Sequence, residues 1–208
     1  MTPTMDLATL AFWLDMIGTF AFGLSGGVLA VRKQLDLFGV IVLATAAATA
    51  GGAIRDAMIG AQPAAVLVDM RYLSAAIAAG ITAFLAYGLV ERLNKPVMLL
   101  DAVGLGVFVI TGTQKALSFG LHPVAACVIG MVSAIGGGII RDILVAEVPR
   151  VLREEIYAVA AILGAMIVVG GTWLGVPPLW TAVLSFTATF ATRVISVRMG
   201  LAIPKARR

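Results

Sequence analysis

Two short motifs each join a glycine cluster to an arginine–aspartate pair. They comprise Gly51, Gly52, Arg55 and Asp56, and Gly136, Gly137, Gly138, Arg141 and Asp142. Glycine lowers helix stability and permits unusual backbone angles, and a broken helix frees carbonyl oxygens that can replace the hydration shell of a cation. The clusters predict kinked, pore-lining segments that bind potassium through backbone near Gly51, Gly52, Gly137 and Gly138. Close packing of helices through small residues is the alternative.

The charged pair of each motif lies at the end of a hydrophobic run. An unpaired charge is costly inside a membrane, so each pair is expected to face a water-filled vestibule or another polar group. Asp56 and Asp142 would attract cations at the mouth of a pore. Alternatively, each pair is a salt bridge that fixes the end of its helix.

Hydroxyl side chains on the neighbouring segments could line a path for hydrated ions, because a hydroxyl both donates and accepts hydrogen bonds. Thr45 and Thr49 are four residues apart and share one helix face. The full set of candidates is Ser25, Thr45, Thr49, Thr111 and Ser133. For each of them, hydrogen bonding between helices is the alternative.

The composition indicates an all-α integral membrane protein. The chain has 208 residues, of which 61% are hydrophobic and 12% charged, whereas soluble domains have about 45–50% and about 25%. The single His122 and the single Cys127 leave no nucleophile–base pair and no metal-ligand cluster, which argues against an enzyme. We expect membrane lipid and monovalent cations as partners, no cofactor beyond permeant potassium, and no nucleic acid.

Seven hydrophobic runs are long enough for membrane helices, which need about 20 apolar residues each. They cover residues 11–31, 37–54, 72–90, 97–117, 122–140, 156–174 and 178–198. The sequence lacks the long period-two alternation of hydrophobic residues that would indicate a β-barrel. The chain, residues 1–208, is therefore predicted to be a single transmembrane domain.

The basic residues predict the orientation, because cytoplasmic loops are enriched in lysine and arginine. With seven crossings, 12 of the 15 basic residues fall on the side of the C-terminus and 3 on the other side. The sequence predicts a multi-pass protein of the cell (inner) membrane, with the C-terminus in the cytoplasm and the N-terminus outside.

The two motifs belong to a longer internal repeat. At a fixed shift of 86 residues, Arg55 matches Arg141 and Asp15 matches Asp101. The halves span about 11–90 and 97–176, and the helix at about 178–198 lies outside them. The shift covers three crossings, an odd number, so the halves would be an inverted 3+3 repeat, which is typical of transport proteins. Asp15 and Asp101 are expected to cap or anchor their helices.

Lys115 interrupts the repeat, because its partner position, Leu29, is apolar. It is predicted near the outer end of its helix, on the side that is poor in basic residues. There it could plug or gate a cation path, or respond to voltage. Alternatively, its long side chain only extends to the interface.

The paired GG-x-x-Arg-Asp motifs in a seven-helix chain of this length resemble the prokaryotic branch of the trimeric intracellular cation (TRIC) channel family. The resemblance covers about residues 10–200. It implies a homotrimer with one hourglass pore per protomer, a preference for potassium, and kinks at Gly51, Gly52, Gly137 and Gly138. It also suggests that Lys115 matches a lysine implicated in gating.

The sequence leaves two functions open. A monovalent cation channel is favoured by kinked helices within an inverted repeat and by the lack of a deep, charged substrate site. A secondary transporter of a small solute such as glycine is the alternative, because the same repeat suits it and some bacterial relatives in the TRIC family look like amino-acid transporters.

Overall fold

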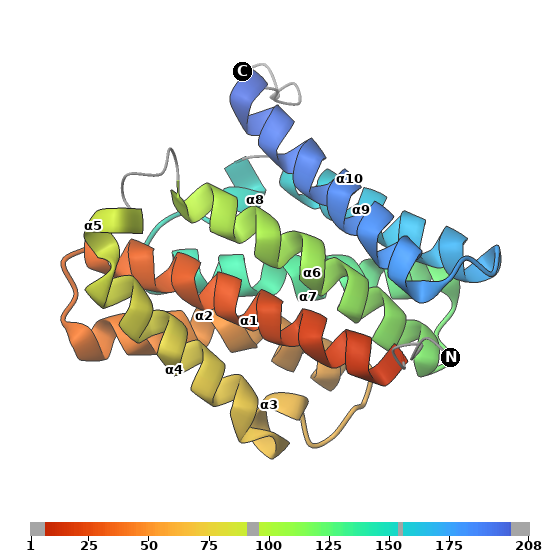
Figure 1. Cartoon of the computed structure of the whole chain (residues 1–208), viewed down its shortest axis with the longest axis horizontal. Coiled ribbons are helices and arrows are strands. Elements are labelled where there is room, and N and C mark those ends of the chain that lie inside the picture. Colours follow the sequence, from red (N-terminus) through yellow and green to blue (C-terminus); the bar gives the residue numbers. More distant parts are fainter. Residues whose placement is uncertain (1–6, 91–95, 154–155, 201–208) are drawn as a thin grey trace, which may run out of the picture.

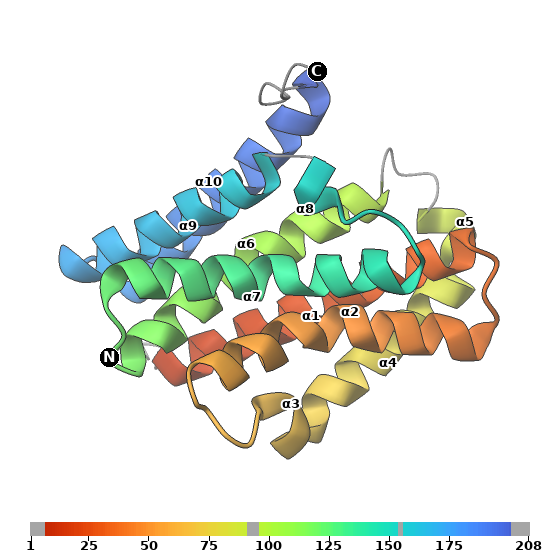
Figure 2. The ribbon, with the colours of Figure 1, turned by 180° about the vertical axis from the view of Figure 1, so that it is seen from behind.

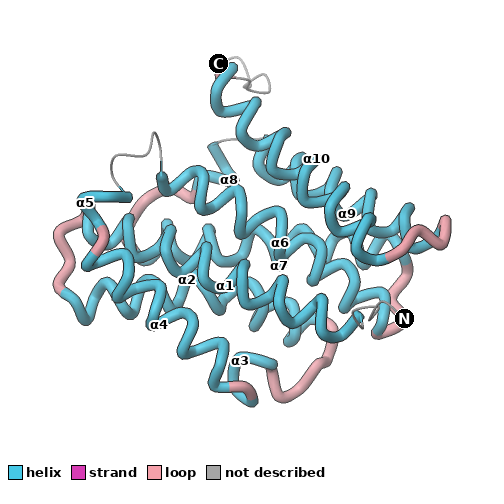
Figure 3. Tube along the Cα trace, in the orientation of Figure 1, coloured by secondary structure: helices cyan, strands magenta, loops and turns pink. Residues whose placement is uncertain are grey.

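The computed structural model describes residues 7–90, 96–153 and 156–200. Within these ranges every regular element is a helix (Figures 1 and 3). The long helices are α1 (Leu7–Arg32), α2 (Leu37–Met58), α6 (Pro96–Ser118), α7 (Pro123–Leu144), α9 (Ile156–Trp173) and α10 (Pro178–Met199). The shorter ones are α3 (Ala65–Val68), α4 (Met70–Leu85), α5 (Tyr87–Val90) and α8 (Arg150–Arg153).

Six of these helices are long and apolar enough to cross a membrane. The third predicted run, residues 72–90, is not one continuous helix. The backbone leaves helical geometry at Ala86 (φ −96°, ψ 13°), which separates α4 from α5. At about 1.5 Å per residue, α4 is shorter than the hydrocarbon core of about 30 Å.

Helices α2 and α7 extend four residues beyond their predicted ends at 54 and 140. Both helices therefore include the arginine and the aspartate of their motif. The charged residues of the motifs do not terminate these helices, because each arginine side chain pairs with carboxylates inside the protein.

The centre of the fold consists of α1, α2, α6 and α7, in which α1 packs against α2 and α6, and α7 packs against the same two helices (Figures 1 and 2). Helix α4 covers α1 and α2, and α9 covers α6 and α7. Helix α10 packs against α9 and α6. In both views α1 and α6 run in opposite directions, as do α2 and α7.

The element bounds follow the shift seen in the sequence. Helix α2 begins at Leu37 and ends at Met58, and α7 begins and ends 86 residues later. Helices α1 and α6 end 86 residues apart, and α4 and α9 begin 86 residues apart. The repeat therefore describes local structure as well as residue types.

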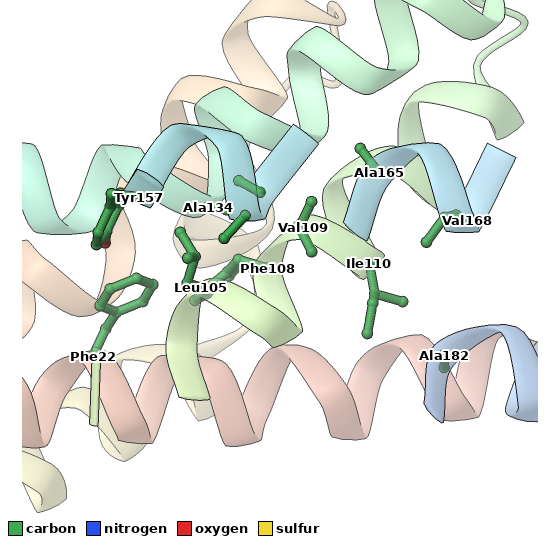
Figure 4. Packing of buried hydrophobic residues seen from close by; sticks show 12 residues of the cluster. Phe22, Leu105, Phe108, Val109, Ile110, Ala134, Tyr157, Ala165, Val168 and Ala182 are labelled. Carbon is green, nitrogen blue, oxygen red and sulfur yellow. The ribbon is translucent and has the colours of Figure 1, made fainter. Parts of the chain in front are cut away.

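Two phenylalanines at matching positions form the centre of the core (Figure 4). The rings of Phe22 and Phe108 stack with centroids 5.6 Å apart. A methyl group at Gly104 would lie 2.6 Å from the Phe22 ring, and one at Gly18 would lie 3.0 Å from the Phe108 ring. Glycine at both positions lets α1 and α6 approach closely around the stacked pair.

Candidate functional site

Helices α2 and α7 cross at their glycines without a break. Both are continuous α-helix through the clusters, so the predicted break that would free carbonyl oxygens is absent from these two helices. A methyl group at Gly51 would lie 2.1 Å from the Ser133 carbonyl oxygen, and one at Gly137 would lie 2.3 Å from the Ala47 carbonyl oxygen. These contacts occupy matching positions, so Gly51 and Gly137 form a close symmetric crossing.

Gly52 and Gly138 have a different surrounding. A methyl group at Gly52 would meet only ordinary contacts, the closest being Arg55 Nη2 at 3.8 Å. At Gly138 it would lie 3.0 Å from Tyr157 Oη and 3.8 Å from Arg141 Nη2. Gly52 therefore has room for a side chain, whereas Gly138 lies close against Tyr157 Oη.

The second motif forms a buried network that we call the second half-site: Ser25, Asp101, Arg141 and Asp142. Within it, Asp101 Oδ2 has no hydrogen-bond partner. Arg141 is fully buried and donates from Nη1 to Asp101 Oδ1 at 2.5 Å and to Ser25 Oγ at 2.6 Å. Its Nε donates to Asp142 Oδ1 at 2.9 Å. Ser25 belongs to α1, so the arginine of one half binds a hydroxyl of the other half.

The first motif forms a looser network that we call the first half-site: Asp15, Arg55, Asp56 and Lys115. Arg55 Nε donates to Asp56 Oδ1 at 2.8 Å, but Arg55 Nη1 lies 3.5 Å from Asp15 Oδ1. Lys115 reaches over from α6 and places Nζ 2.7 Å from Asp56 Oδ1. Tyr72 donates to Asp15 Oδ2 at 3.3 Å.

Each motif aspartate also holds the chain that follows its helix. Asp56 Oδ2 accepts a hydrogen bond from the Ala65 backbone N–H, and Asp142 Oδ2 accepts one from the Arg150 backbone N–H, both at 2.9 Å. The carboxylates thus connect the arginine to the start of α3 or α8. Each pair therefore faces other polar groups, which is one of the two surroundings expected from the sequence, and its place at the mouth of a pore stays a prediction.

A small cavity adjoins the first half-site. It measures about 20 Å³ and is lined by residues of α1, α2, α3, α4 and α6. Asp15, Thr19, Thr49 and Arg55 are among its polar residues, and Val66 and Phe108 are among its apolar ones. That volume holds about one water molecule. Asp15 Oδ1 and Arg55 Nη1 are buried there without a hydrogen-bond partner.

The hydroxyl side chains that the sequence predicted to line an ion path lie in different surroundings. Ser25 belongs to the second half-site, and Thr49 lines the cavity while donating to the Thr45 carbonyl oxygen at 2.8 Å. The hydroxyl oxygens of Thr45, Thr111 and Ser133 are buried without a hydrogen-bond partner.

Asp15 and Asp101 are more than the helix caps expected from the sequence, since each faces the arginine of its own half. The matching positions of Asp15 and Asp101 in the repeat were the sequence signal that could have indicated this shared role. Tyr72 and Tyr157 border the half-sites without having been predicted, and they do not match each other at the shift of 86 residues. Nothing in the sequence pattern distinguishes these two tyrosines.

The six apolar helices and two buried arginine–carboxylate networks define a multi-pass α-helical membrane protein. A family profile described as Glycine transporter matches residues 12–88 and 98–173, two segments that begin 86 residues apart. The chain is 43% identical over 176 residues to a UPF0126 membrane protein of Deinococcus radiodurans, covering 84% of this chain and 80% of that protein. It is 37% identical over 197 residues to the UPF0126 inner membrane protein YadS of Escherichia coli, covering 94% and 95%. The chain therefore belongs to the family that this profile describes and that includes these UPF0126 membrane proteins.

Solved structures place its fold among the TRIC channels. A structure that describes conductance through TRIC cation channels superposes with a TM-score of 0.85 at 33% identity, covering 95% of this chain and 97% of that one. The TRIC orthologue from Rhodobacter sphaeroides gives 0.85 at 35% identity, covering 93% and 100%. The resemblance expected from the paired motifs is confirmed, and the similarity to channels fits a protein that is not an enzyme.

Proposed function

We propose that the protein is a potassium-preferring cation channel that assembles as a homotrimer with one pore per protomer. The similarity to cation channels supports cation conduction. The observation that carries the proposal is the Lys115 ammonium on the buried Asp56 carboxylate. A monovalent cationic group already occupies a carboxylate buried in the protein, at a position that the repeat does not require.

In this proposal the ion path passes beside α2 and α7, and Lys115 acts as a tethered plug. When its ammonium leaves Asp56, the carboxylate becomes available to a permeant potassium ion. The glycines at the crossing let α2 and α7 bend as the path opens, since a residue without a side chain tolerates changes in backbone angle. Carbonyl oxygens near Gly51, Gly52, Gly137 and Gly138 would then contact the ion.

We further propose that the two halves are inverted repeats and that α4, continued by α5, makes a seventh crossing. The opposite directions of α1 and α6, and of α2 and α7, support this arrangement. The N-terminus would lie outside and the C-terminus in the cytoplasm, as the lysine and arginine distribution favours. Part of that distribution, Arg92, Lys95, Lys205, Arg207 and Arg208, lies outside the described residues.

Glycine transport is the second candidate, because the matching family profile carries that name. Proteoliposomes containing the purified protein distinguish the two functions. A channel releases internal potassium down its gradient and does not accumulate glycine. Saturable, sodium- or proton-driven glycine uptake without potassium release would instead favour the transporter.

A further inference from the structure

The space beside the second glycine of each motif differs between the two halves of the repeat. Gly52 lines the cavity of about 20 Å³, whose wall also includes Thr19 and Thr49. At Gly138, the matching position, a methyl group would lie 3.0 Å from Tyr157 Oη. One half therefore has an open space at this position, and the other has a tyrosine hydroxyl.

The walls of the matching space are apolar in the second half. At the shift of 86 residues, Thr19 and Thr49 correspond to Leu105 and Ile135. Leu105 and Tyr157 are buried in one hydrophobic cluster (Figure 4), and Ile135 packs against that cluster. The Tyr157 side chain is only 2% exposed. These matches indicate that Tyr157 fills, in the second half, the space that the first half leaves as a cavity.

Helix α10, which lies outside the repeat, packs a polar face against α9 and α6. Four polar residues at intervals of four, the spacing of one helix face, are each at most 3% exposed: Thr181, Ser185, Thr189 and Arg193. The Ser185 hydroxyl donates to the Gly164 carbonyl oxygen at 2.9 Å, which connects α10 to α9. Further along this face, Arg193 contacts Tyr157 of α9.

Arg193 holds the face of the Tyr157 ring. Its Cζ lies 4.7 Å from the ring centroid, within the distance of about 6 Å at which a guanidinium group is attracted to an aromatic face. The attraction is stronger for a buried pair, because water does not compete for the charge, and Arg193 is 1% exposed. The contact therefore favours the ring position that keeps the Tyr157 hydroxyl beside Gly138.

This ring position leaves polar atoms unsatisfied. Among the described residues, Asp101 Oδ2 and Tyr157 Oη are both buried without a hydrogen-bond partner, and both side chains border Gly138. A buried polar group without a partner is costly. Movement of the ring away from Gly138 would admit water or a cation to Asp101, which offsets part of the cost of breaking the aromatic contact.

We propose that Tyr157 is the constriction of the ion path at the second half-site, and that Arg193 is the positioning residue that keeps its ring beside Gly138. The path opens there when the ring leaves this space. Helix α10 thus controls access to the second half-site although it does not belong to the repeat. This inference rests on the proposed channel function, and the constriction is separate from the contact of Lys115 with Asp56 in the first half-site.

Silver ions test the constriction without requiring conduction, because Ag⁺ has the charge of potassium, is close to it in size and binds thiolates. Leu105, which is 0% exposed and lies one turn from Asp101 on α6, is changed to cysteine in a Cys127→Ala protein. After exposure to silver nitrate in chloride-free buffer, the remaining thiol is alkylated under denaturing conditions and counted by mass spectrometry.

We expect Leu105→Cys to be protected from silver while Tyr157 is present. Tyr157→Ala should raise the reaction rate at least about tenfold, which corresponds to about 1.4 kcal/mol in the free energy of opening. Tyr157→Phe keeps the ring and should preserve the protection.

Variants of Arg193 test its positioning role. Arg193→Met removes the charge and should raise the silver rate, whereas Arg193→Lys keeps a cation over the ring and should preserve part of the protection. In the Tyr157→Ala background Arg193→Met should add nothing, and this cycle cancels the other contacts of Arg193. Arg71→Met is the matched control with an unchanged rate, because the Arg71 guanidinium lies 4.2 Å from the Phe12 ring centroid but belongs to an exposed side chain.

The constriction is overturned if Leu105→Cys stays protected in Tyr157→Ala, or if it reacts equally fast with Tyr157 in place. It is also overturned if Tyr157→Ala exposes Val28→Cys, in a separate cluster, to the same degree, because the ring would then be an ordinary core residue. An unchanged rate in Arg193→Met overturns the role of Arg193. Failure of the channel proposal is recognised separately, because wild-type proteoliposomes would then release no potassium, whereas protection that depends on Tyr157 would still support the constriction.

Discussion

Lys115 on α6 and Asp56 on α2 belong to opposite halves of the chain, and their charged groups meet at 2.7 Å. Asp56 has two further partners, Arg55 and the Ala65 backbone N–H, so it keeps hydrogen bonds when Lys115 leaves. Lys115 is the more exposed partner, since its side chain is 28% exposed and that of Asp56 is 1% exposed. In the proposed function, the contact would open by movement of the lysine.

Replacing Lys115 with methionine should increase conduction. The variant keeps a side chain of similar length but removes the ammonium from Asp56, so the carboxylate is free to attract a permeant cation. We expect a several-fold higher potassium efflux rate from proteoliposomes at equal protein content. Lys33→Met is a control, because Lys33 pairs with Glu147 at the surface instead. Unchanged or slower efflux in Lys115→Met would argue against a plug.

Alanine at Gly51 should destabilise the protein, whereas alanine at Gly52 should not. A methyl group at Gly51 would lie 2.1 Å from the Ser133 carbonyl oxygen, but one at Gly52 has its closest contact at 3.8 Å. Forcing α2 and α7 apart costs about 1–3 kcal/mol by analogy with overpacked cores. Thermal unfolding in detergent should show a lower melting temperature for Gly51→Ala and for its counterpart Gly137→Ala. Equal stability of Gly51→Ala and Gly52→Ala would refute the close crossing.

Removing the second arginine should cost more stability than removing the first. Arg141 makes three hydrogen-bonded contacts with Asp101, Asp142 and Ser25, while Arg55 bonds Asp56 closely but reaches Asp15 only at 3.5 Å. Breaking a buried ion pair costs about 3–5 kcal/mol. We expect Arg141→Gln to fall in that range and Arg55→Gln to cost less. Unfolding experiments that rank the two variants in the opposite order would contradict the difference between the half-sites.

Acid should weaken a surface contact between the halves. Lys33, after α1, lies 2.7 Å from Glu147, after α7, and its hydrogen bond holds the pKa of the Glu147 carboxyl below the ordinary value of 4.5. A lowered folded-state pKa stabilises the protein above the unfolded-state pKa, and this stabilisation disappears as the pH falls through the folded-state pKa. Both side chains are well exposed, so the contribution is at most about 1 kcal/mol.

The measurement is the melting temperature of wild type and Glu147→Gln from about pH 6 down to about pH 3, the range in which a glutamate with a normal or lowered pKa titrates. Wild type should be slightly more stable at the upper end, and the difference should vanish at the lower end. A difference that grows toward acid pH would show that the sign is wrong.

The repeat explains why much of the fold is predictable from the sequence. The shift between Arg55 and Arg141 places α2 and α7 correctly, and the proline-bounded starts of α7 and α10 agree with their hydrophobic runs. The break at Ala86 escaped prediction because leucines on both sides, Leu85 and Leu89, keep the run hydrophobic. Hydropathy measures affinity for lipid and says little about backbone angles.

The site was predicted less completely than the fold. Gly51 and Gly137 were predicted as kinks, with close helix packing as the alternative, and the structure shows the close packing. Sequence alone does not distinguish a glycine that breaks a helix from one that admits a neighbouring carbonyl oxygen. That difference depends on the distance between α2 and α7. The unequal distances from Arg55 to Asp15 and from Arg141 to Asp101 are likewise invisible in a repeat that gives both pairs the same residues.

Single-channel recording of the purified protein in planar bilayers tests the central claim most directly. With a potassium chloride gradient across the bilayer, the account predicts discrete unitary currents that reverse near the equilibrium potential of potassium, and an open probability that rises in Lys115→Met. Currents that reverse near the chloride potential, or the absence of any current above the protein-free bilayer in both proteins, would contradict it.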